Sequence, residues 1–261
     1  MQLIASRQNP RYRALRDLAE DKRARRQRGE TLLDGEHLLQ IARTAGAAVL
    51  TLIATPEVQA TGRLDAWRAI WPQAETILLA KPLLRALAPT QTPTGIMAVV
   101  AIPRPTGRTP RCAVLLEDIQ DPGNLGAILR TAAAAGVDAV YLSQGCCEAW
   151  SPKALRGGQG AQLIIDVYEG VDLAAWVRAW PGPCHAAVLG AQRPLYALDL
   201  RGNCAFVFGN EGAGLSAQLR TVCAPFSIPM PGRTESLNVA AAAAVCLFER
   251  VRQLQGQGAA D

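Results

Sequence analysis

The chain has 261 residues, which is enough for one large domain or two domains of ordinary size. Hydrophobic residues make up 49% and charged residues 19%, a composition that excludes a disordered chain, and no apolar run approaches the roughly 20 residues that span a bilayer. The net charge of +5 is uneven, because residues 1–111 hold 17 Lys and Arg against 9 Asp and Glu, whereas residues 112–261 hold 10 against 13.

The first thirty residues carry the densest positive charge and lack the apolar centre of a secretory signal, so we expect a cytoplasmic protein. Leu15, Leu18 and Ala19 have the spacing of one helical face, which predicts an amphipathic helix with a cationic side. Basic faces are often only solvated, but Tyr12 among the arginines and the uneven charge favour a phosphate-rich partner. The candidate phosphate-binding side chains are Arg11, Arg13, Arg23, Arg25, Arg26 and Arg28.

Strands and helices are predicted to alternate through the rest of the first half. Apolar runs at 47–55, 76–80 and 95–102 predict strands separated by helical patterns, which indicates a small α/β domain. The stretch PRPTGRTPR, residues 103–111, has three prolines and three arginines and is typical of a linker. We therefore expect one domain at residues 1–105, a linker at 106–111 and a second domain at 112–261.

The second half predicts a parallel sheet. Residues 112–143 read as strand, turn, helix and strand, a unit whose two strands pair in parallel. Later apolar runs, AAVLG, CAFVFG and FSIPM, predict short strands that each stop at Gly or Pro, and a last helix is expected from Val239 to Gln253. The predicted fold class is α/β.

Three loops at predicted strand ends are candidates for a binding site, since ligands bind beyond the carboxyl ends of parallel strands. Arg130 lies four residues after Gly126 on the predicted helix, so the two share a face, and Arg130 either serves a ligand or pairs with a neighbouring carboxylate. Glu211 stands between glycines and either contacts a ligand or accepts backbone amides in a turn. Ser236 and Asn238 precede five alanines and could only cap a helix, or also contact a ligand.

Common nucleotide and metal motifs are absent from these loops. The sequence GNEGAG is neither the dinucleotide fingerprint nor a phosphate-binding loop with Lys. The chain has seven cysteines without a C-x-x-C pair and two histidines, so we predict reduced thiols and no metal site.

Together, the three loops resemble the signature motifs of the SpoU/TrmH-type RNA 2′-O-methyltransferases of the SPOUT superfamily. The first motif appears as NLGAILRTA from Asn124 to Ala132, the second as FGNEGAGLS from Phe208 to Ser216, and the third as IPMPGRTESLNVA from Ile228 to Ala240. The basic first half is similar to the RNA-binding domain that precedes the catalytic domain in many members, and this domain resembles certain ribosomal proteins.

The resemblance implies a cofactor and a fold. Family members bind S-adenosylmethionine in a deep trefoil knot formed by the C-terminal segments, a feature that general topology rules would not predict. Matched to the family pattern, the cofactor-binding residues are expected to be Leu189, Gly190, Gly209, Ile228, Met230, Ser236, Leu237 and Asn238.

The resemblance also implies catalytic residues. Arg130 matches the family's catalytic arginine, and the polar residues expected around it are Asn124, Glu211, Ser236 and Asn238. Arginine is often proposed as the base, but a guanidinium keeps its proton in proteins. We therefore expect Arg130 to hold a substrate phosphate and to stabilise the developing alkoxide.

The expected partner is RNA, with a homodimer and no membrane or DNA partner. Lys153 and Arg156 lie in a segment that resembles the family's RNA-side opening, where Gly158 departs from a frequent Ser; Ala240 likewise replaces a frequent Ser in the third motif. The separate first domain favours ribosomal RNA over transfer RNA, because small members that act on transfer RNA often lack it. A transfer RNA methyltransferase and a non-catalytic RNA-binding factor are the alternatives.

Overall fold

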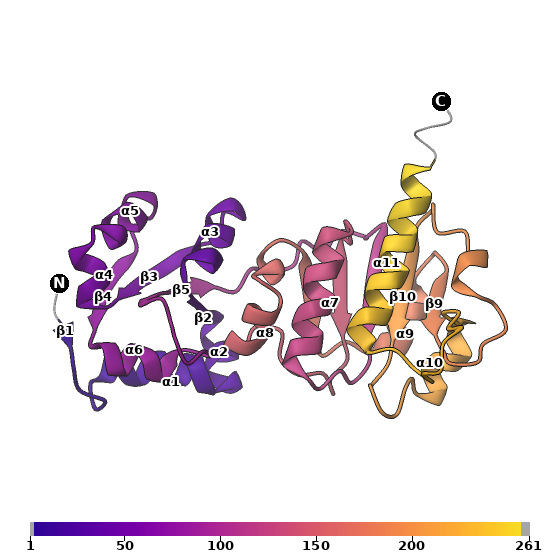
Figure 1. Cartoon of the computed structure of the whole chain (residues 1–261), viewed down its shortest axis with the longest axis horizontal. Coiled ribbons are helices and arrows are strands. Elements are labelled where there is room, and N and C mark those ends of the chain that lie inside the picture. Colours follow the sequence, from indigo (N-terminus) through magenta and orange to yellow (C-terminus); the bar gives the residue numbers. More distant parts are fainter. Residues whose placement is uncertain (1–2, 257–261) are drawn as a thin grey trace. The chain divides into compact units, whose positions relative to one another are not determined.

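The computed structural model describes residues 3–256 and divides into two compact units. The first unit contains residues 3–104 together with Trp150–Ile164, and the second contains Pro105–Ala149 and residues 165–256. The chain therefore passes between the units three times. Figure 1 colours the chain along the sequence and labels many of its helices and strands.

The first unit is built on a five-stranded mixed sheet in the order β1-β4-β3-β5-β2. Strands β1, β3 and β4 are parallel, whereas β5 is antiparallel to both β3 and β2. The strands are β1 (Leu3–Ile4), β2 (Glu30–Asp34), β3 (Val49–Ala54), β4 (Glu75–Leu79) and β5 (Ile96–Ala101). The apolar runs of the sequence predicted β3, β4 and β5.

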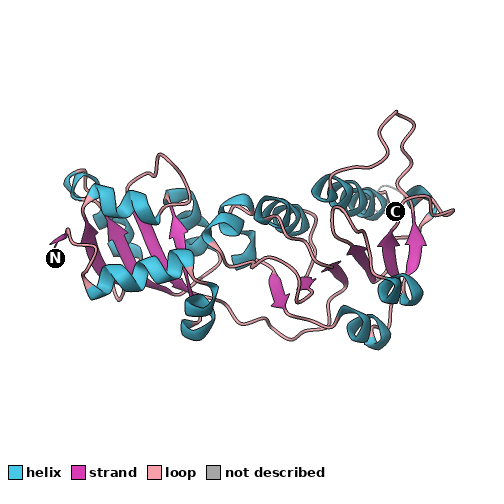
Figure 2. Cartoon of the chain, turned by 90° about the horizontal axis from the view of Figure 1, so that it is seen from below, coloured by secondary structure: helices cyan, strands magenta, loops and turns pink. Residues whose placement is uncertain are grey.

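Helices lie on both sides of this sheet (Figures 1 and 2). They are α1 (Pro10–Glu20), α2 (Lys22–Arg28), α3 (Glu36–Thr44), α4 (Pro56–Ala60), α5 (Arg63–Ile70) and α6 (Lys81–Leu87). Leu15 and Leu18 of α1 join Leu83 and Leu84 of α6 in one apolar core on the strands. The α/β prediction for this part of the chain is confirmed.

The basic N-terminal segment differs from its prediction in two ways. It forms two helices, because Asp21 ends α1 and caps α2 by accepting the Arg23 amide at 2.8 Å. Arg25 is only 4% exposed and donates to the carbonyl of Leu18 at 2.6 Å, so it holds the two helices together and is removed from the predicted phosphate-binding set. Tyr12 is also buried, with its hydroxyl donating to Leu83, and is a core residue.

A segment from the second half of the sequence completes the first unit. It contains α8 (Pro152–Gly157) and the short 3₁₀ helix η1 (Ala161–Leu163), and α8 packs against β2, the edge strand of the sheet. The buried hydroxyl of Thr31 donates to the carbonyl of Trp150 at 2.6 Å. The expected second domain, residues 112–261, is therefore not one continuous unit, because residues 150–164 belong to the first unit.

The second unit holds a six-stranded sheet in the order β11-β9-β10-β6-β7-β8, with every pairing parallel. The strands are β6 (Cys112–Leu116), β7 (Ala139–Leu142), β8 (Asp166–Glu169), β9 (Cys184–Ala187), β10 (Cys204–Phe208) and β11 (Ala224–Phe226). The predicted linker has no regular structure, and the Thr106 amide donates to Asp166 of β8 at 2.9 Å. The predicted parallel sheet is confirmed.

Helices and a 3₁₀ turn surround this second sheet. They are α7 (Pro122–Ala134), α9 (Leu173–Ala179), η2 (Leu195–Ala197), α10 (Ala217–Val222) and α11 (Val239–Gln255). The long helices α7 and α11 pack on each other, while α9 and α10 cover a second apolar cluster that includes Leu115, Leu173 and Leu219. Within residues 3–256, no helix has both the length and the apolar character needed to cross a membrane.

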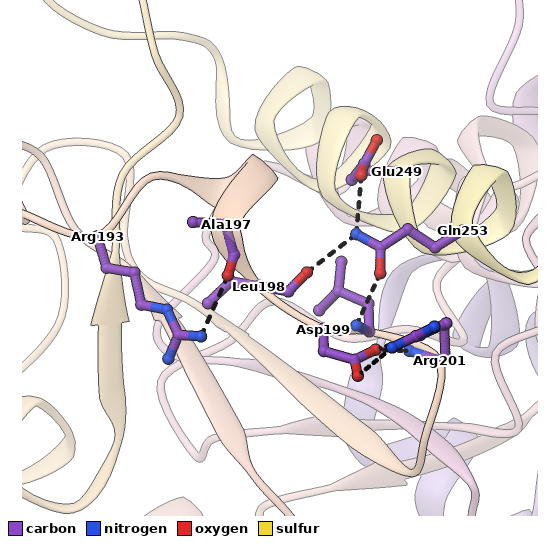
Figure 3. Close-up of polar contacts among 8 residues, drawn as sticks. Arg193, Ala197, Leu198, Asp199, Arg201, Glu249 and Gln253 are labelled. Carbon is purple, nitrogen blue, oxygen red and sulfur yellow. Dashed lines mark hydrogen bonds and ion pairs between the residues drawn. The ribbon is translucent and has the colours of Figure 1, made fainter.

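The C-terminal helix is tied to the connection between β9 and β10 (Figure 3). The side-chain amide of Gln253 donates to the carbonyl of Leu198 at 3.0 Å and accepts the amide of Leu200 at 2.9 Å. It also donates to Glu249, one turn earlier in α11, at 2.8 Å. These contacts hold the last turns of α11 against a loop that lies more than fifty residues earlier in the sequence.

Candidate active site

A cavity of about 530 Å³ lies at the carboxyl ends of β9, β10 and β11. Its walls are the end of β9 and the residues that follow it (187–190), the end of β10 and the loop that follows it (208–215), Arg220 of α10, and part of the segment from β11 to the first turn of α11 (residues 227, 228, 230, 236–239 and 242). The volume is within the roughly 300–1,000 Å³ of ordinary small-molecule sites. This edge of the sheet is where a ligand was expected from the strand pattern.

All of the residues that were predicted to bind the cofactor line this cavity. They come from the loop after β9 and from the second and third motifs: Leu189, Gly190, Gly209, Ile228, Met230, Ser236, Leu237 and Asn238. Leu189 and Leu237 expose apolar side chains there, at 66% and 40% of their surface. The cavity thus offers apolar side chains beside amide and hydroxyl groups, a combination suited to a nucleoside.

Gly209 has no space for a side chain. A Cβ at this position would lie 2.5 Å from the carbonyl oxygen of Gly214 and 2.6 Å from the amide nitrogen of Leu215. Both neighbours are backbone atoms of the same loop. This loop folds back over Gly209, and the backbone amide of Gly214 donates a hydrogen bond to the carbonyl of Asn210. The glycine therefore permits the close approach that shapes one wall of the cavity.

Asn210 organises this loop and was missed in the sequence. Its side-chain oxygen accepts the amides of Gly212 and Ala213 at 2.9 and 3.0 Å, while its side-chain nitrogen donates to the carbonyl of Asp118 at 2.8 Å. The turn-forming role considered for Glu211 thus belongs to Asn210. An Asn between glycines, whose side chain can bond the backbone two residues on, is a recognisable turn signal that could have identified it.

A chain of hydrogen bonds joins the three motifs. Asn124 of α7 donates through its side-chain nitrogen to Glu211 at 2.8 Å, and its side-chain oxygen accepts from Asn238 at 2.9 Å. Asn238 in turn caps α11 by accepting the amide of Ala240 at 2.9 Å. Asn238 therefore caps a helix and also belongs to the hydrogen-bond chain of the site. The sequence had offered capping alone or capping together with a ligand contact.

The loop between β6 and α7 is fastened to the site by acidic residues that the sequence did not single out. Glu117 accepts the amide of Ser216 at 2.7 Å, and Asp121 caps α7 by accepting the amide of Asn124 at 2.7 Å. Asp118 has a positive φ of 54° and accepts from the hydroxyl of Ser143 at 2.6 Å. These bonds hold the start of α7, and with it Asn124, in place.

Arg130 and Ser236 are placed apart from this hydrogen-bond chain. Ser236 lines the cavity, but Arg130 projects from α7 outside the cavity lining and is exposed. In the described range 3–256, the Arg130 guanidinium has no hydrogen-bond or ion-pair partner. The alternative in which Arg130 pairs with a carboxylate of its own chain is therefore not what the structure shows.

The predicted basic residues have different surroundings. Arg13, Arg23 and Arg26 are exposed, Arg11 pairs with Glu75 at 2.7 Å, and Arg28 donates to the carbonyl of Ala14 at 3.1 Å. Lys153 and Arg156 are exposed on α8 and therefore belong to the first unit. The segment that was expected to face the RNA from the second domain adds its charge to the first one.

Metal and thiol chemistry find no support at the site. Across the part of the chain that the structure describes, no group of three His, Cys, Asp or Glu side chains could hold a metal ion. Cys147 lies near the site, but burial, followed by the effects of Cys146, Asp121 and Glu211, raises the pKa of this thiol to about 12. It stays protonated at neutral pH and is a poor nucleophile.

Family models match both parts of the chain. The model of the SpoU rRNA methylase family matches residues 111–248, and that of the MRM3-like substrate-binding domain matches residues 9–98. The first match begins at residue 111, the last residue of the predicted linker, and the second lies within residues 1–105.

Two relatives are similar to the chain over most of its length. An uncharacterized tRNA/rRNA methyltransferase of Synechocystis is 35% identical over 257 residues, covering 96% of this chain and 93% of that protein. The 23S rRNA guanosine 2′-O-methyltransferase RlmP of Bacillus subtilis is 32% identical over 231 residues, covering 87% of this chain and 90% of that protein.

A solved structure resembles the chain over nearly its whole length. The SpoU methyltransferase AviRb of Streptomyces viridochromogenes, in complex with the cofactor AdoMet, matches with a TM-score of 0.82 and 28% identity, covering 94% of this chain and 98% of that one. The cavity of the present chain fits such a cofactor, because it has nucleoside-sized volume and the close backbone approach at Gly209.

Proposed function

The chain belongs to the SpoU rRNA methylase family, and from this premise we propose that it methylates a ribose in ribosomal RNA. It is an S-adenosylmethionine-dependent RNA ribose 2′-O-methyltransferase. The observation that carries the ribosomal substrate is the similarity to RlmP, which covers both the basic first unit and the catalytic part. A 2′-hydroxyl is present in RNA and absent from DNA, so DNA is not a substrate.

The cofactor is proposed to lie in the cavity beyond β9, β10 and β11. The apolar side chains of Leu189, Ile228 and Leu237 would pack on its adenosine part, and Gly209 would let backbone approach it closely. Bound there, the cofactor supplies a methyl group carried on a sulfonium. Asn124, Glu211 and Asn238 are held by their mutual hydrogen bonds before any ligand arrives, so little reorganisation is needed.

Arg130 is proposed to act on the RNA. Its five N–H donors are unpaired within residues 3–256 and match the oxygens of a phosphate in a bidentate arrangement. A phosphate held in this way would orient the ribose, and the positive charge would stabilise the 2′-oxygen as it loses its proton. The guanidinium keeps its own proton throughout, so the proton passes to the phosphate or to water.

Two variants of Arg130 test this role. Because the side chain is exposed and makes no hydrogen bond or ion pair within residues 3–256, Arg130→Ala and Arg130→Lys should fold normally and bind the cofactor with unchanged affinity in calorimetry. Losing a preorganised donor at a reacting centre typically costs about 100- to 1,000-fold in rate, so we expect Arg130→Ala to lose most activity. Arg130→Lys should also be impaired, since lysine lacks the bidentate geometry. Full activity in both variants would rule out the proposed role.

The substrate is identified by methyl transfer from labelled S-adenosylmethionine to total RNA from a strain lacking the gene, followed by digestion to nucleosides and mapping. We expect label in a 2′-O-methylnucleoside of ribosomal RNA, and none with Arg130→Ala. Label in transfer RNA would keep the enzyme and change its substrate. Binding of the cofactor and RNA without any transfer, including to ribosome assembly intermediates, would favour a non-catalytic factor.

The active form is proposed to be a homodimer with a knotted catalytic unit. The dimer is supported by apolar side chains left on the surface of the second unit, including Phe248 of α11 at 50% exposure and Tyr196 at 59%. The knot is supported by the convergence of three C-terminal loops on one cavity and by the attachment of α11 to the β9–β10 connection. Light scattering at micromolar concentration should give twice the 27.8 kDa chain mass.

A further inference from the structure

The cofactor cavity contains one positive side chain. Among the described residues that line it, only Glu211 and Arg220 are charged, and the other side chains are apolar, hydroxyl or amide. Glu211 already accepts a hydrogen bond from Asn124 at 2.8 Å. Arg220 is not among the residues that either the mechanism or the motifs assign, since it lies on α10, between the second and third motifs.

Arg220 lies against the glycine-rich loop. Its Nη2 would be 3.3 Å from a Cβ placed at Gly214, whose φ of +69° is in the left-handed region. The absence of a side chain at Gly214 thus leaves the guanidinium beside the cavity. Within residues 3–256 the guanidinium has no hydrogen-bond or ion-pair partner, although it carries five donors. An exposed, unpaired guanidinium that lines a ligand cavity is suited to an anionic group of the ligand.

The ligand offers one anionic group. S-Adenosylmethionine has a neutral adenosine end, and at its methionine end a sulfonium, an ammonium and a single carboxylate. Arginine binds carboxylates through two parallel N–H···O bonds, which gives both affinity and orientation. We propose that Arg220 binds the cofactor's carboxylate and so fixes the methionine end of the molecule, and this assignment rests on the proposed use of the cavity by the cofactor.

The test compares ligands that differ in this one group. Wild-type protein and Arg220→Gln are titrated in a calorimeter with S-adenosylmethionine, with its decarboxylated analogue, and with 5′-methylthioadenosine, which lacks the whole amino-acid part. A charge-assisted bond at a partly exposed site should be worth about ten-fold in affinity. Arg220→Gln should therefore bind S-adenosylmethionine about ten-fold more weakly, and the other two ligands as the wild type does.

Two further variants sharpen the comparison. Arg220→Lys keeps the charge without the fork of donors and should lie between the wild type and Arg220→Gln. Arg178→Gln removes an exposed arginine of α9 outside the cavity and should bind all three ligands normally, which controls for net charge.

Each contrary result has a distinct meaning. If Arg220→Gln weakens all three ligands equally, Arg220 only shapes the loop, and the inference is wrong. If the affinity of Arg220→Gln for S-adenosylmethionine equals that of the wild type, the guanidinium contacts solvent or RNA and not the cofactor, and the inference is also wrong. If the wild type itself does not bind S-adenosylmethionine, the cavity assignment fails, and this inference with it.

Discussion

A methyl group at position 209 would meet backbone, not a movable side chain. Gly209→Ala would place Cβ 2.5 Å from the Gly214 oxygen, so the loop must shift and the cavity wall with it. We expect S-adenosylmethionine affinity to fall by at least about ten-fold, corresponding to about 1.4 kcal/mol. Calorimetric titration measures this.

Gly212→Ala is the matched control for that change. The nearest heavy atom to its Cβ would be the Asn210 side-chain oxygen at 3.6 Å, which is an ordinary contact. Near-normal cofactor affinity is expected. Equal loss in the two variants would mean that the loop tolerates no side chain at all, and that the close approach at Gly209 has no special role.

His185 should make the second unit sensitive to acid. It is 5% exposed on β9, its ring lies 6.1 Å from that of Phe206, and neither ring nitrogen has a hydrogen-bond partner in the described residues. Burial, and to a lesser extent Arg193, lowers the pKa of His185. Because the unfolded chain then binds a proton more readily, stability is present above about pH 6.5 and is lost as the pH falls below it.

The measurement is the thermal midpoint between pH 8 and pH 5 by scanning calorimetry. His185→Phe removes the titrating group within an aromatic cluster, so its midpoint should fall less toward pH 5 than that of the wild type. The free energy of unfolding of the wild type should fall, relative to that of His185→Phe, by at most about 1.4 kcal/mol per pH unit. His37→Phe, an exposed position on α3, should retain the wild-type dependence. An identical pH dependence in His185→Phe and wild type would contradict the argument.

At the scale of elements, the packing of α8 on β2 depends on a buried hydrogen bond. Thr31→Val keeps the shape of the side chain but leaves the Trp150 carbonyl without the donor now 2.6 Å away. An unsatisfied buried acceptor costs about 1–3 kcal/mol. We expect the thermal midpoint to fall by several degrees, measured by scanning calorimetry.

Thr76→Val, on β4, is the comparison for that variant. Its side chain is half-buried and makes no hydrogen bond within the described range, so the same substitution should leave the midpoint almost unchanged. If Thr31→Val is equally neutral, the bond to Trp150 does not hold the segment.

The sequence predicted most elements because their patterns are local. The strands β3, β4, β5, β6 and β10 are short apolar runs bounded by turns, and α7 and α11 begin at recognisable caps. The site residues were predicted through a resemblance to known motifs, and the structure brings most of them together. The predictions that were wrong depend on distant contacts. The burial of Arg25 requires α1 beside α2, and residues 150–164 pack on a sheet formed by residues more than a hundred positions earlier.

At the scale of the whole molecule, the first unit carries the positive charge proposed to hold RNA. Binding to phosphates releases counterions, so affinity for ribosomal RNA should fall steeply with salt. Arg23→Gln should weaken binding and reduce the slope of log affinity against log salt by about one, if Arg23 contacts one phosphate. Filter binding or fluorescence anisotropy at several salt concentrations measures both quantities.

Arg178→Gln removes the same charge from the second unit, where Arg178 is exposed on α9. The slope of log RNA affinity against log salt for Arg178→Gln should remain that of the wild type. Equal effects from Arg23→Gln and Arg178→Gln would mean that net charge alone governs binding, and would contradict the assignment of RNA recognition to the first unit. Charge variants are preferable to removing residues 1–105, because that deletion would strip α8 of the strand on which it packs.

The return of residues 150–164 to the first unit also sets an order of events on the ribosome. When residue 104 has been synthesised, the edge strand β2 is complete but α8, which packs on it, is not. Adding residues 105–164 takes roughly 3–12 s at about 5–20 residues per second. During that interval the nascent sheet has an incomplete edge, the kind of surface on which strands of other chains pair. Translation speed through this stretch therefore bears on how much of the protein reaches its native state.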